Sequence, residues 1–559
     1  MKRTIKIIAA MLILAVFAVP AAMGNDEDES MSKVARNLDI FNSLYKELNT
    51  FYVDTINSEK SIERAINAML DNIDPYTEYI PAKDQEDFRV ISTGEYGGIG
   101  SYIMYRPTGP KKGTYISSPS EGSPAAKAGL RPGDRILMIN NDSVTSWSSD
   151  SVSAHLKGQA NTSLRVTVER PYVEDSILTF NLVRETIKMN PVPYYGVAND
   201  CMGYISLTTF NEHSAQRVKE AVEALKKNPK VKYLVLDLRS NGGGLMESAI
   251  QIVGCFVPKG TQVLVTRGRD KASEKIYKTT QDPIDTKIPL AVLIDGSSAS
   301  SSEITAGALQ DLDRAVIIGT RSFGKGLVQT TRPLPYDGLL KVTVAKYYIP
   351  SGRLIQEFDY SKRNADGTFA HTPDSLANVF HTAHCREVRD GGGITPDITV
   401  EYPELNRLVY NVVRDHWAFD FATKYASEHA TIPSPSQFKV TDEIYNEFKA
   451  FIDPGKFNYD KVCEQGLEAL QKLAKTEGYM NDSTKAEFEK LGALLKHDLG
   501  QDLDTNRKEI SKIIAQELMD RYYYQAGETE FMMCNDETMD ATLKMFAKPG
   551  EYKRILNIK

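Results

Sequence analysis

The stretch that decides the fold runs from Leu290 to Gln329 and reads LAVLIDGSSASSSEITAGALQDLDRAVIIGTRSFGKGLVQ. An apolar run ends in an Asp-Gly turn, and a serine cluster then leads into a helical pattern. A second β-rich run precedes Lys325, which stands between two glycines. Strand, tight turn, serine and helix together expose a serine at the positive end of a helix. Because glycine keeps side chains out of the way, Lys325 is a candidate base for such a serine.

The spacing of these residues resembles that of the C-terminal processing peptidases, also called tail-specific proteases. Their core reads roughly S-A-S-A-S-E-I, Q-D, G and F-G-K-G-x-V-Q, and this chain has Ser298–Ile304, Gln310-Asp311, Gly319 and Phe323–Gln329. The resemblance implies that Ser300 is the nucleophile and Lys325 the base. It also implicates Gln329 and Asp311. Ser301 stands where the family often has alanine, and its backbone N–H can still serve an oxyanion hole.

A glycine-rich turn, DLRSNGGG at Asp237–Gly244, follows a stretch that reads as a buried strand. Sites in open α/β sheets lie at the carboxyl ends of their strands. The family carries a similar turn, in which a glycine N–H helps to build the oxyanion hole. This implies Gly242 or Gly243, and the sequence leaves the choice between them open. Tyr347–Gln356 also matches a family signature and is expected to shape the groove.

The proposed base has an energetic requirement. A lysine with the reference pKa of about 10.4 needs roughly 4.6 kcal/mol to be neutral near pH 7, and burial in an apolar pocket can supply a shift of that size. Gln329 is expected to hydrogen-bond the amine of Lys325 without adding a charge. Asp311 lies about 16 Å from Ser300 along a helix, so we expect it to anchor the loop that carries Lys325 rather than to touch the serine.

A second resemblance, to PDZ domains, covers residues 95–186. Gly98-Ile99-Gly100 fits the carboxylate-binding loop, and Ser123–Leu137 fits the helix, turn and strand that follow in such a domain. A PDZ domain adds its peptide ligand as an extra strand at a sheet edge. The implied partners are proteins or peptides with apolar C-terminal tails.

From residue 187 onward, strand-like and helical stretches alternate, which predicts an α/β core with parallel strands. The expected fold is therefore multidomain α/β. In order, the chain is expected to contain a signal peptide (1–24), an N-terminal helical region (25–94), a PDZ domain (95–186), an α/β serine peptidase core (187–402) and a C-terminal helical region (403–559). The last region carries no catalytic motif, so the helical terminal regions are candidates for docking or for a homodimer interface.

Composition narrows the function classes. The chain has 559 residues, 41% of them hydrophobic, and a formal net charge of −7. Its basic residues form no sustained run, which argues against nucleic acid as a partner. The five cysteines show no C-x-x-C spacing, so they are expected to be buried or idle thiols. We expect no metal site and no cofactor.

The N-terminus has the pattern of a targeting segment. Basic residues precede an apolar run, Ile7–Met23, and the small residues Ala22 and Gly24 suit cleavage before Asn25. The alternative is an uncleaved membrane anchor, for which the apolar run is at the short limit. We expect an exported protein of the periplasm or cell envelope.

Three functional hypotheses follow from these patterns. The first is a serine endopeptidase that recognises the C-terminal tails of exported proteins and cleaves them through an acyl-enzyme by a Ser-Lys mechanism. The second is a non-catalytic PDZ-containing scaffold, which has no need for Ser300, Lys325 and Gln329 together. The third is a hydrolase of the penicillin-binding type. That class places its lysine three residues after the serine, where this chain has Glu303.

Overall fold

The computed structural model describes residues 19–558, apart from Pro110, Asp200, Ala365, Thr372, Pro403 and Asp460. Residues 1–18 of the predicted signal peptide therefore lie outside the described residues. The chain divides into two compact units: residues 1–79 with Leu340–Val342, and the remainder. Among the described helices, none is both long enough and apolar enough to cross a bilayer.

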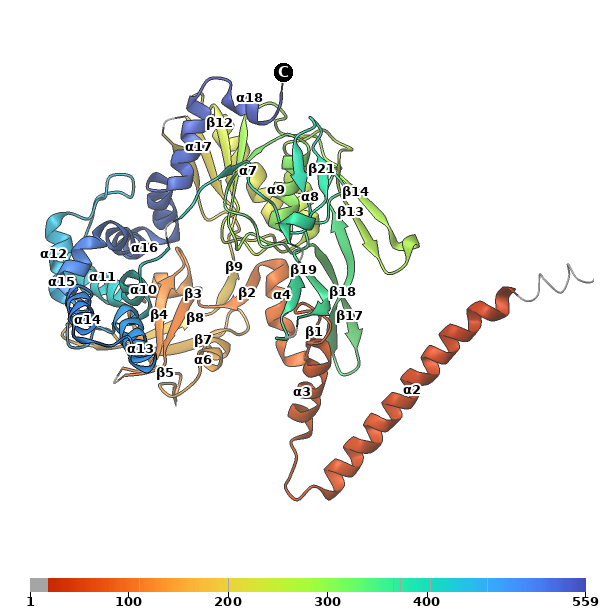
Figure 1. The fold of residues 1–559 in the computed structure, drawn as a ribbon, viewed down its shortest axis with the longest axis horizontal. Helices are drawn as coiled ribbons and strands as arrows, with labels where there is room; N and C mark the ends of the chain where they lie inside the picture. The colour runs from red at the N-terminus through yellow and green to blue at the C-terminus, as the bar shows by residue number, and fades with distance from the viewer. Residues whose placement is uncertain are drawn as a thin grey trace, which may run out of the picture. The chain divides into compact units, whose positions relative to one another are not determined.

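The first unit contains the helices α2 (Val19–Phe51) and α3 (Ser58–Leu70), shown in Figure 1. Asn57 caps α3 by accepting a hydrogen bond from the Lys60 N–H at 3.0 Å. Helices are thus present where the N-terminal helical region is expected. Large apolar side chains of α2 are exposed, among them Met31, Val34, Leu38, Phe41, Leu44, Leu48 and Phe51.

The second unit is built around a six-stranded sheet. Its strands, in spatial order, are β10 (Tyr195–Ala198), β11 (Met202–Ser206), β12 (Tyr233–Asp237), β15 (Leu290–Ile294), β16 (Val316–Gly319) and β23 (Ile398–Thr399). All neighbouring pairs are parallel except β10 with β11. The predicted parallel α/β core is confirmed. Because Asp237 pairs with Leu293 and Ile294 with Gly319, the strand ends that carry the candidate site lie at one edge.

Helices cover both faces of this sheet. On one face, α7 (Ser214–Lys226), α8 (Met246–Gly254) and α9 (Ser301–Asp311) bury the side chains of Leu236 and Val292. On the other face lie α17 (Glu537–Ala547) and α18 (Glu551–Ile555) (Figure 1). They pack against the alternate side chains of the same strands, which point away from α7, α8 and α9. There the ring of Phe546 stacks on Tyr233 with centroids 4.3 Å apart. The end of the chain therefore forms the second helical layer of the core.

A smaller antiparallel sheet adjoins α9. It includes β13 (Gln262–Gly268), β14 (Lys275–Lys278), β17 (Leu327–Leu334) and β18 (Gly338–Tyr348). Strand β13 pairs with β18, so that Val265 faces Tyr348. The segment with Lys325 lies directly before β17.

The predicted PDZ region forms a domain with its own core. Its sheet order is β3 (Ser101–Arg106), β4 (Gly113–Pro119), β5 (Arg135–Ile139), β7 (Ser163–Glu169) and β8 (Ile177–Val183), accompanied by α5 (Pro124–Ala128) and α6 (Ser149–Leu156). Ile116, Ile136, Val152 and Val166 are fully buried in that core. In this sheet β3 has only one neighbour, β4, which leaves its other edge open among the described strands.

The C-terminal helical region is confirmed as a further packed body. It comprises α10 (Arg407–Arg414), α11 (Trp417–Glu428), α12 (Asp442–Phe451), α13 (Val462–Thr476), α14 (Asp482–Leu494), α15 (Leu499–Thr505) and α16 (Arg507–Cys534). Phe421, Phe448 and Leu518 lie in its core. Tyr524 interrupts α16 with φ 57° and ψ −168°, which kinks the helix.

Candidate active site

Ser300 occupies the turn between β15 and α9, immediately before the first residue of the helix. Its φ of 56° and ψ of −114° are sparsely populated for a residue with a Cβ, so the backbone here is strained. A strained backbone conformation of this kind persists only where contacts with the surrounding structure stabilise it. The free N–H groups of the first helical turn lie next to this serine.

The neighbouring serines of the cluster have other tasks. The hydroxyl of Ser298 donates to Leu238 O at 2.8 Å, that of Ser301 to Gly244 O at 2.9 Å, and that of Ser302 to Asn241 O at 2.8 Å. All three therefore attach the start of α9 to the glycine-rich turn Asp237–Gly244. Ser297 is exposed.

A single buried carboxylate holds the serine and the lysine segments together. Oε2 of Glu303 accepts hydrogen bonds from the backbone N–H of Ser300 at 2.8 Å and of Lys325 at 2.9 Å. Oε1 accepts from Ser322 Oγ at 2.6 Å and from Gly324 N at 2.7 Å. The backbone nitrogens of Ser300 and Lys325 are therefore close to each other, because both donate to the same oxygen atom.

Tyr347 makes a matching connection on the carbonyl side. Its hydroxyl, buried with the ring at 1% exposure, lies 2.9 Å from Lys325 O and 3.3 Å from Ser300 O. The sequence predicts that Tyr347 belongs to a segment that shapes the groove, and it assigns no role to Glu303 beyond its place in the family motif. The signal for Glu303 was present, because a glutamate three residues after a helix-capping serine typically reaches back to that serine's N–H.

Burial also changes the acidity of Glu303. With none of its surface exposed, desolvation raises the pKa of this carboxyl to about 7, while the hydrogen bonds from Ser322, Lys325, Gly324 and Ser300 act in the opposite direction.

The glycine-rich turn approaches Ser300 closely, and it distinguishes the two oxyanion-hole candidates. The Gly243 N–H donates to Asn241 Oδ1 at 2.9 Å, and a Cβ on Gly243 would lie 2.9 Å from that of Ser300. Gly243 therefore provides space rather than a donor. The Gly242 N–H has no acceptor among the described residues, and Ser301 begins α9, so its N–H lacks an intrahelical partner.

The other two predicted residues lie farther along the same elements. Asp311, at the end of α9, forms a buried ion pair with Arg353 at 2.9 Å and accepts from the Ser351 N–H at 2.9 Å. It anchors this later segment, whereas we expected it to anchor the loop that carries Lys325. Gln329 lies on β17, and its Nε2 donates to Thr343 Oγ1 at 3.2 Å, which leaves Oε1 as an acceptor.

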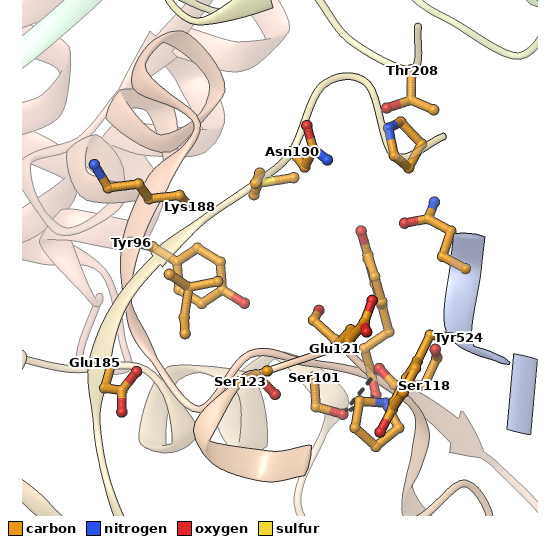
Figure 2. A pocket seen from close by; sticks show the side chains of 18 of the residues that line it. Tyr96, Ser101, Ser118, Glu121, Ser123, Glu185, Lys188, Asn190, Thr208 and Tyr524 are labelled. Carbon is orange, nitrogen blue, oxygen red and sulfur yellow. Dashed lines mark hydrogen bonds between the residues drawn. The ribbon is translucent and has the colours of Figure 1, made fainter. Parts of the chain in front are cut away.

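The predicted carboxylate loop is followed directly by Ser101, which lines a cleft. Gly98 ends β2 (Glu95–Gly98), Ile99 is buried in the PDZ core, and Gly100 has φ 68° with its carbonyl bonded to Ser120 N. A Cβ on Gly100 would lie 2.5 Å from that of Ser123. Ser123 in turn lines this cleft of about 800 Å³, whose other walls are the segment 185–190 and the kink of α16 (Figure 2).

Other kinds of site find little support in the described chain. Among the described residues, no cluster of three His, Cys, Asp or Glu side chains is placed to hold a metal ion. All five cysteines are free; Cys255 is buried and Cys201 partly so, but Cys385, Cys463 and Cys534 are exposed.

Comparison with known proteins identifies the family of the chain. The peptidase family S41 model matches residues 201–360, a PDZ domain model residues 115–170, and a model described as "Probable PDZ-protease, C-terminal helical domain" residues 408–546. A carboxy-terminal-processing protease of Bartonella bacilliformis is 35% identical over 382 residues, 68% of this chain and 77% of that protein. A probable CtpA-like serine protease of Staphylococcus aureus strain COL is 29% identical over 505 residues, 87% of this chain and 88% of that protein.

Among solved structures, the photosystem II D1 C-terminal processing protease is similar at 28% identity with a TM-score of 0.35, covering 64% of this chain and 86% of that one. The assignment rests on the sequence relatives and the family models. The chain belongs to the carboxy-terminal-processing peptidases, serine-type peptidases of family S41 that carry a PDZ domain.

Proposed function

We propose that Ser300 and Lys325 are the nucleophile and the general base of this peptidase. The observation that carries the proposal is the double connection through Glu303 and Tyr347, which ties both backbones to the same two side chains. Ser300 also has the strained, helix-capping conformation of an exposed nucleophile.

In the proposed reaction, the Ser300 hydroxyl attacks the scissile carbonyl carbon while its proton passes to the neutral amine of Lys325. The resulting oxyanion accepts hydrogen bonds from the N–H groups of Gly242 and Ser301, for which the described residues provide no acceptor. The protonated Lys325 then gives its proton to the leaving amine, and a serine ester remains. A water molecule gives a proton to the same amine as it attacks the ester carbon, and Lys325 returns that proton to Ser300 Oγ as the ester bond breaks.

We further propose that the PDZ domain selects apolar C-terminal tails of exported proteins. The support is the Gly98-Ile99-Gly100 loop beside the open edge of β3, together with the adjoining cleft. A free carboxylate should matter, since backbone N–H groups would bind its charge. Peptides with a free-acid end should therefore be bound and cut better than their amidated forms, and equal rates for both would contradict this mode of recognition.

A peptide-cleavage assay tests the Ser-Lys pair. Ser300→Ala and Lys325→Ala should each abolish turnover, and the double variant should lose little more, because the two residues act as one unit. Lys325→Arg should be inactive as well, since a guanidinium does not release its proton. Ser297→Ala is the matched control, because Ser297 is exposed. Substantial activity in Lys325→Arg would overturn the assignment, and cleavage by no form of the protein would favour the scaffold hypothesis.

Export and assembly are separate proposals. We propose cleavage before Asn25, on the pattern of the N-terminal segment, and a location in the periplasm or cell envelope. N-terminal sequencing should begin near Asn25, whereas recovery of intact Met1 in membranes would favour the anchor.

The exposed apolar side chains of α2 support a homodimer, for which sedimentation of the mature protein is the test.

A further inference from the structure

The strongest unassigned feature beside the active site is a buried ion network between the glycine-rich turn and the end of the chain. Arg239 lies in the turn, two residues after Asp237, the last residue of β12. Its Nη2 is 2.6 Å from Asp237 Oδ2, and its Nη1 is 2.5 Å from Asp536 Oδ2. The three side chains keep only 18%, 7% and 8% of their surface exposed, in the order Arg239, Asp237, Asp536.

Asp536 performs two tasks with its two oxygens. Oδ1 accepts from Thr538 N at 2.7 Å and Met539 N at 3.1 Å, which caps α17. Oδ2 is left for Arg239. Since α17 packs on the sheet through Met539 and Phe546, the carboxylate that reaches the turn is fixed by the second helical layer of the core.

The turn beyond Arg239 is held on its other side by hydrogen bonds to α9, Asp295 and Leu207, whereas Arg239 is its link to the end of the chain. The Ser240 N–H donates to Asp295 at 3.0 Å, with Ser240 at φ 57°, and the Asn241 amide donates to Leu207 O at 2.7 Å. Gly242 follows directly, with no side chain and no acceptor for its N–H among the described residues. The direction of that N–H is therefore set by the backbone between Arg239 and Gly243.

We propose that Asp536 is a positioning residue for the oxyanion hole: by holding Arg239, it keeps the turn Asp237–Gly244 in the geometry that directs the Gly242 N–H at the scissile carbonyl oxygen. This inference rests on the proposed function of Ser300. It gives the C-terminal region, which carries no catalytic motif, a part in the chemistry. Asp536 does not touch the substrate and acts only through Arg239.

The variant Asp536→Asn isolates this role. Asparagine caps helices as well as aspartate does, so α17 keeps its cap, and Arg239 keeps the carboxylate of Asp237. We expect kcat to fall by about 10- to 100-fold, the range expected when an oxyanion donor is misdirected. The KM, the affinity for a free-acid tail peptide and the melting temperature should stay close to those of the wild type.

A transition-state readout separates positioning from general destabilisation. A peptide boronate, which forms a tetrahedral adduct with a serine hydroxyl, should bind Asp536→Asn more weakly by about the same factor as kcat falls. Asp498→Asn is the matched control, since Asp498 caps α15 through Gln501 N and is exposed. That substitution should change neither kcat nor boronate affinity.

Arg239→Lys supplies an independent variant, because lysine retains the charge but cannot span both carboxylates with a planar fork. It should lower kcat by a similar factor, and the double variant Arg239→Lys/Asp536→Asn should lose little more than either single one. Wild-type kcat in Asp536→Asn, or multiplicative losses in the double variant, would overturn the inference. Inactivity of Ser300→Ala alongside wild-type kcat in Asp536→Asn would leave the proposed function standing and this inference refuted.

Discussion

Glu303 connects the backbones of the proposed nucleophile and the proposed base. Its carboxylate is surrounded by four donors, and two of them belong to the proposed nucleophile and base. An acceptor with this many partners satisfies N–H groups that the strained turn and the helix end leave unpaired. The same burial that makes it effective raises its pKa to about 7.

The raised pKa predicts a pH-dependent stability. The folded protein binds the Glu303 proton more tightly than the unfolded chain does, since the pKa lies above the ordinary value of 4.5. The stability gained in this way is complete below about pH 4.5 and lost as pH rises through about 7. In urea unfolding from pH 4.5 to 8.5, the stability of the wild type relative to Glu303→Gln should therefore decline, then level off. A constant difference would refute this assignment of the pKa.

At the scale of elements, α9 is attached at both ends. Its first turn meets Lys325 through Glu303, and its last residue, Asp311, meets Arg353. Arg353 is 1% exposed and also donates to Gln310 Oε1 at 2.7 Å and to Arg389 O at 3.0 Å. The helix therefore connects the turn with Ser300 to the segment that follows β18.

We expect the loss of the buried ion pair between Asp311 and Arg353 to lower the stability of the protein but not its catalytic activity. Asp311→Asn leaves the charge of Arg353 uncompensated in the interior and should lower the free energy of unfolding by about 3–5 kcal/mol. The double variant Asp311→Asn/Arg353→Met should cost less, because no charge remains buried. Activity per folded molecule should stay near that of the wild type. Glu428→Gln, which breaks the exposed pair with Lys424, is the control and should change stability by less than about 0.5 kcal/mol.

At the scale of the whole second unit, the C-terminal helices connect the other parts. Arg106 of β3 pairs with Asp420 of α11 at 2.6 Å, and Ser118 of β4 donates to Asp520 of α16 at 2.7 Å, so the PDZ domain is attached to the helical region. The chain then continues from α16 to Asp536 and to the helices that cover the core sheet. One continuous segment thus contacts the PDZ domain, the cleft and the glycine-rich turn Asp237–Gly244.

The covering helices should be essential for folding. A chain that ends at Asn535 would expose the sheet face on which Met539, Met545, Phe546 and Leu556 are buried. Each such side chain contributes about 1.5–3 kcal/mol, and together they approach the total stability of a domain. We expect this shortened chain to be insoluble or unfolded by circular dichroism. A chain that ends at Leu556 keeps all four and should fold. A folded, active chain ending at Asn535 would contradict the second-layer role.

The parallel α/β core, the PDZ domain and the helical C-terminal region could all be predicted from the sequence, as could the candidates Ser300 and Lys325. These depend on hydrophobic periodicity and on motifs within short windows, which act locally along the chain. The sequence could not distinguish Gly242 from Gly243 as the oxyanion-hole donor, because the two differ only in whether the folded chain provides an acceptor for the N–H. It paired Asp311 with the wrong loop and gave the chain's end no part in the core.

The partners of Glu303, Asp311 and Arg239 could not be predicted, because they depend on how the folded chain packs. Arg239 and Asp536 are 297 positions apart, and no local propensity or spacing can relate residues so distant. Their contact arises because α17 packs its apolar face on a sheet whose strands come from the middle of the chain. Burial then requires the charges that meet there to pair, and that requirement exists only once the chain is folded.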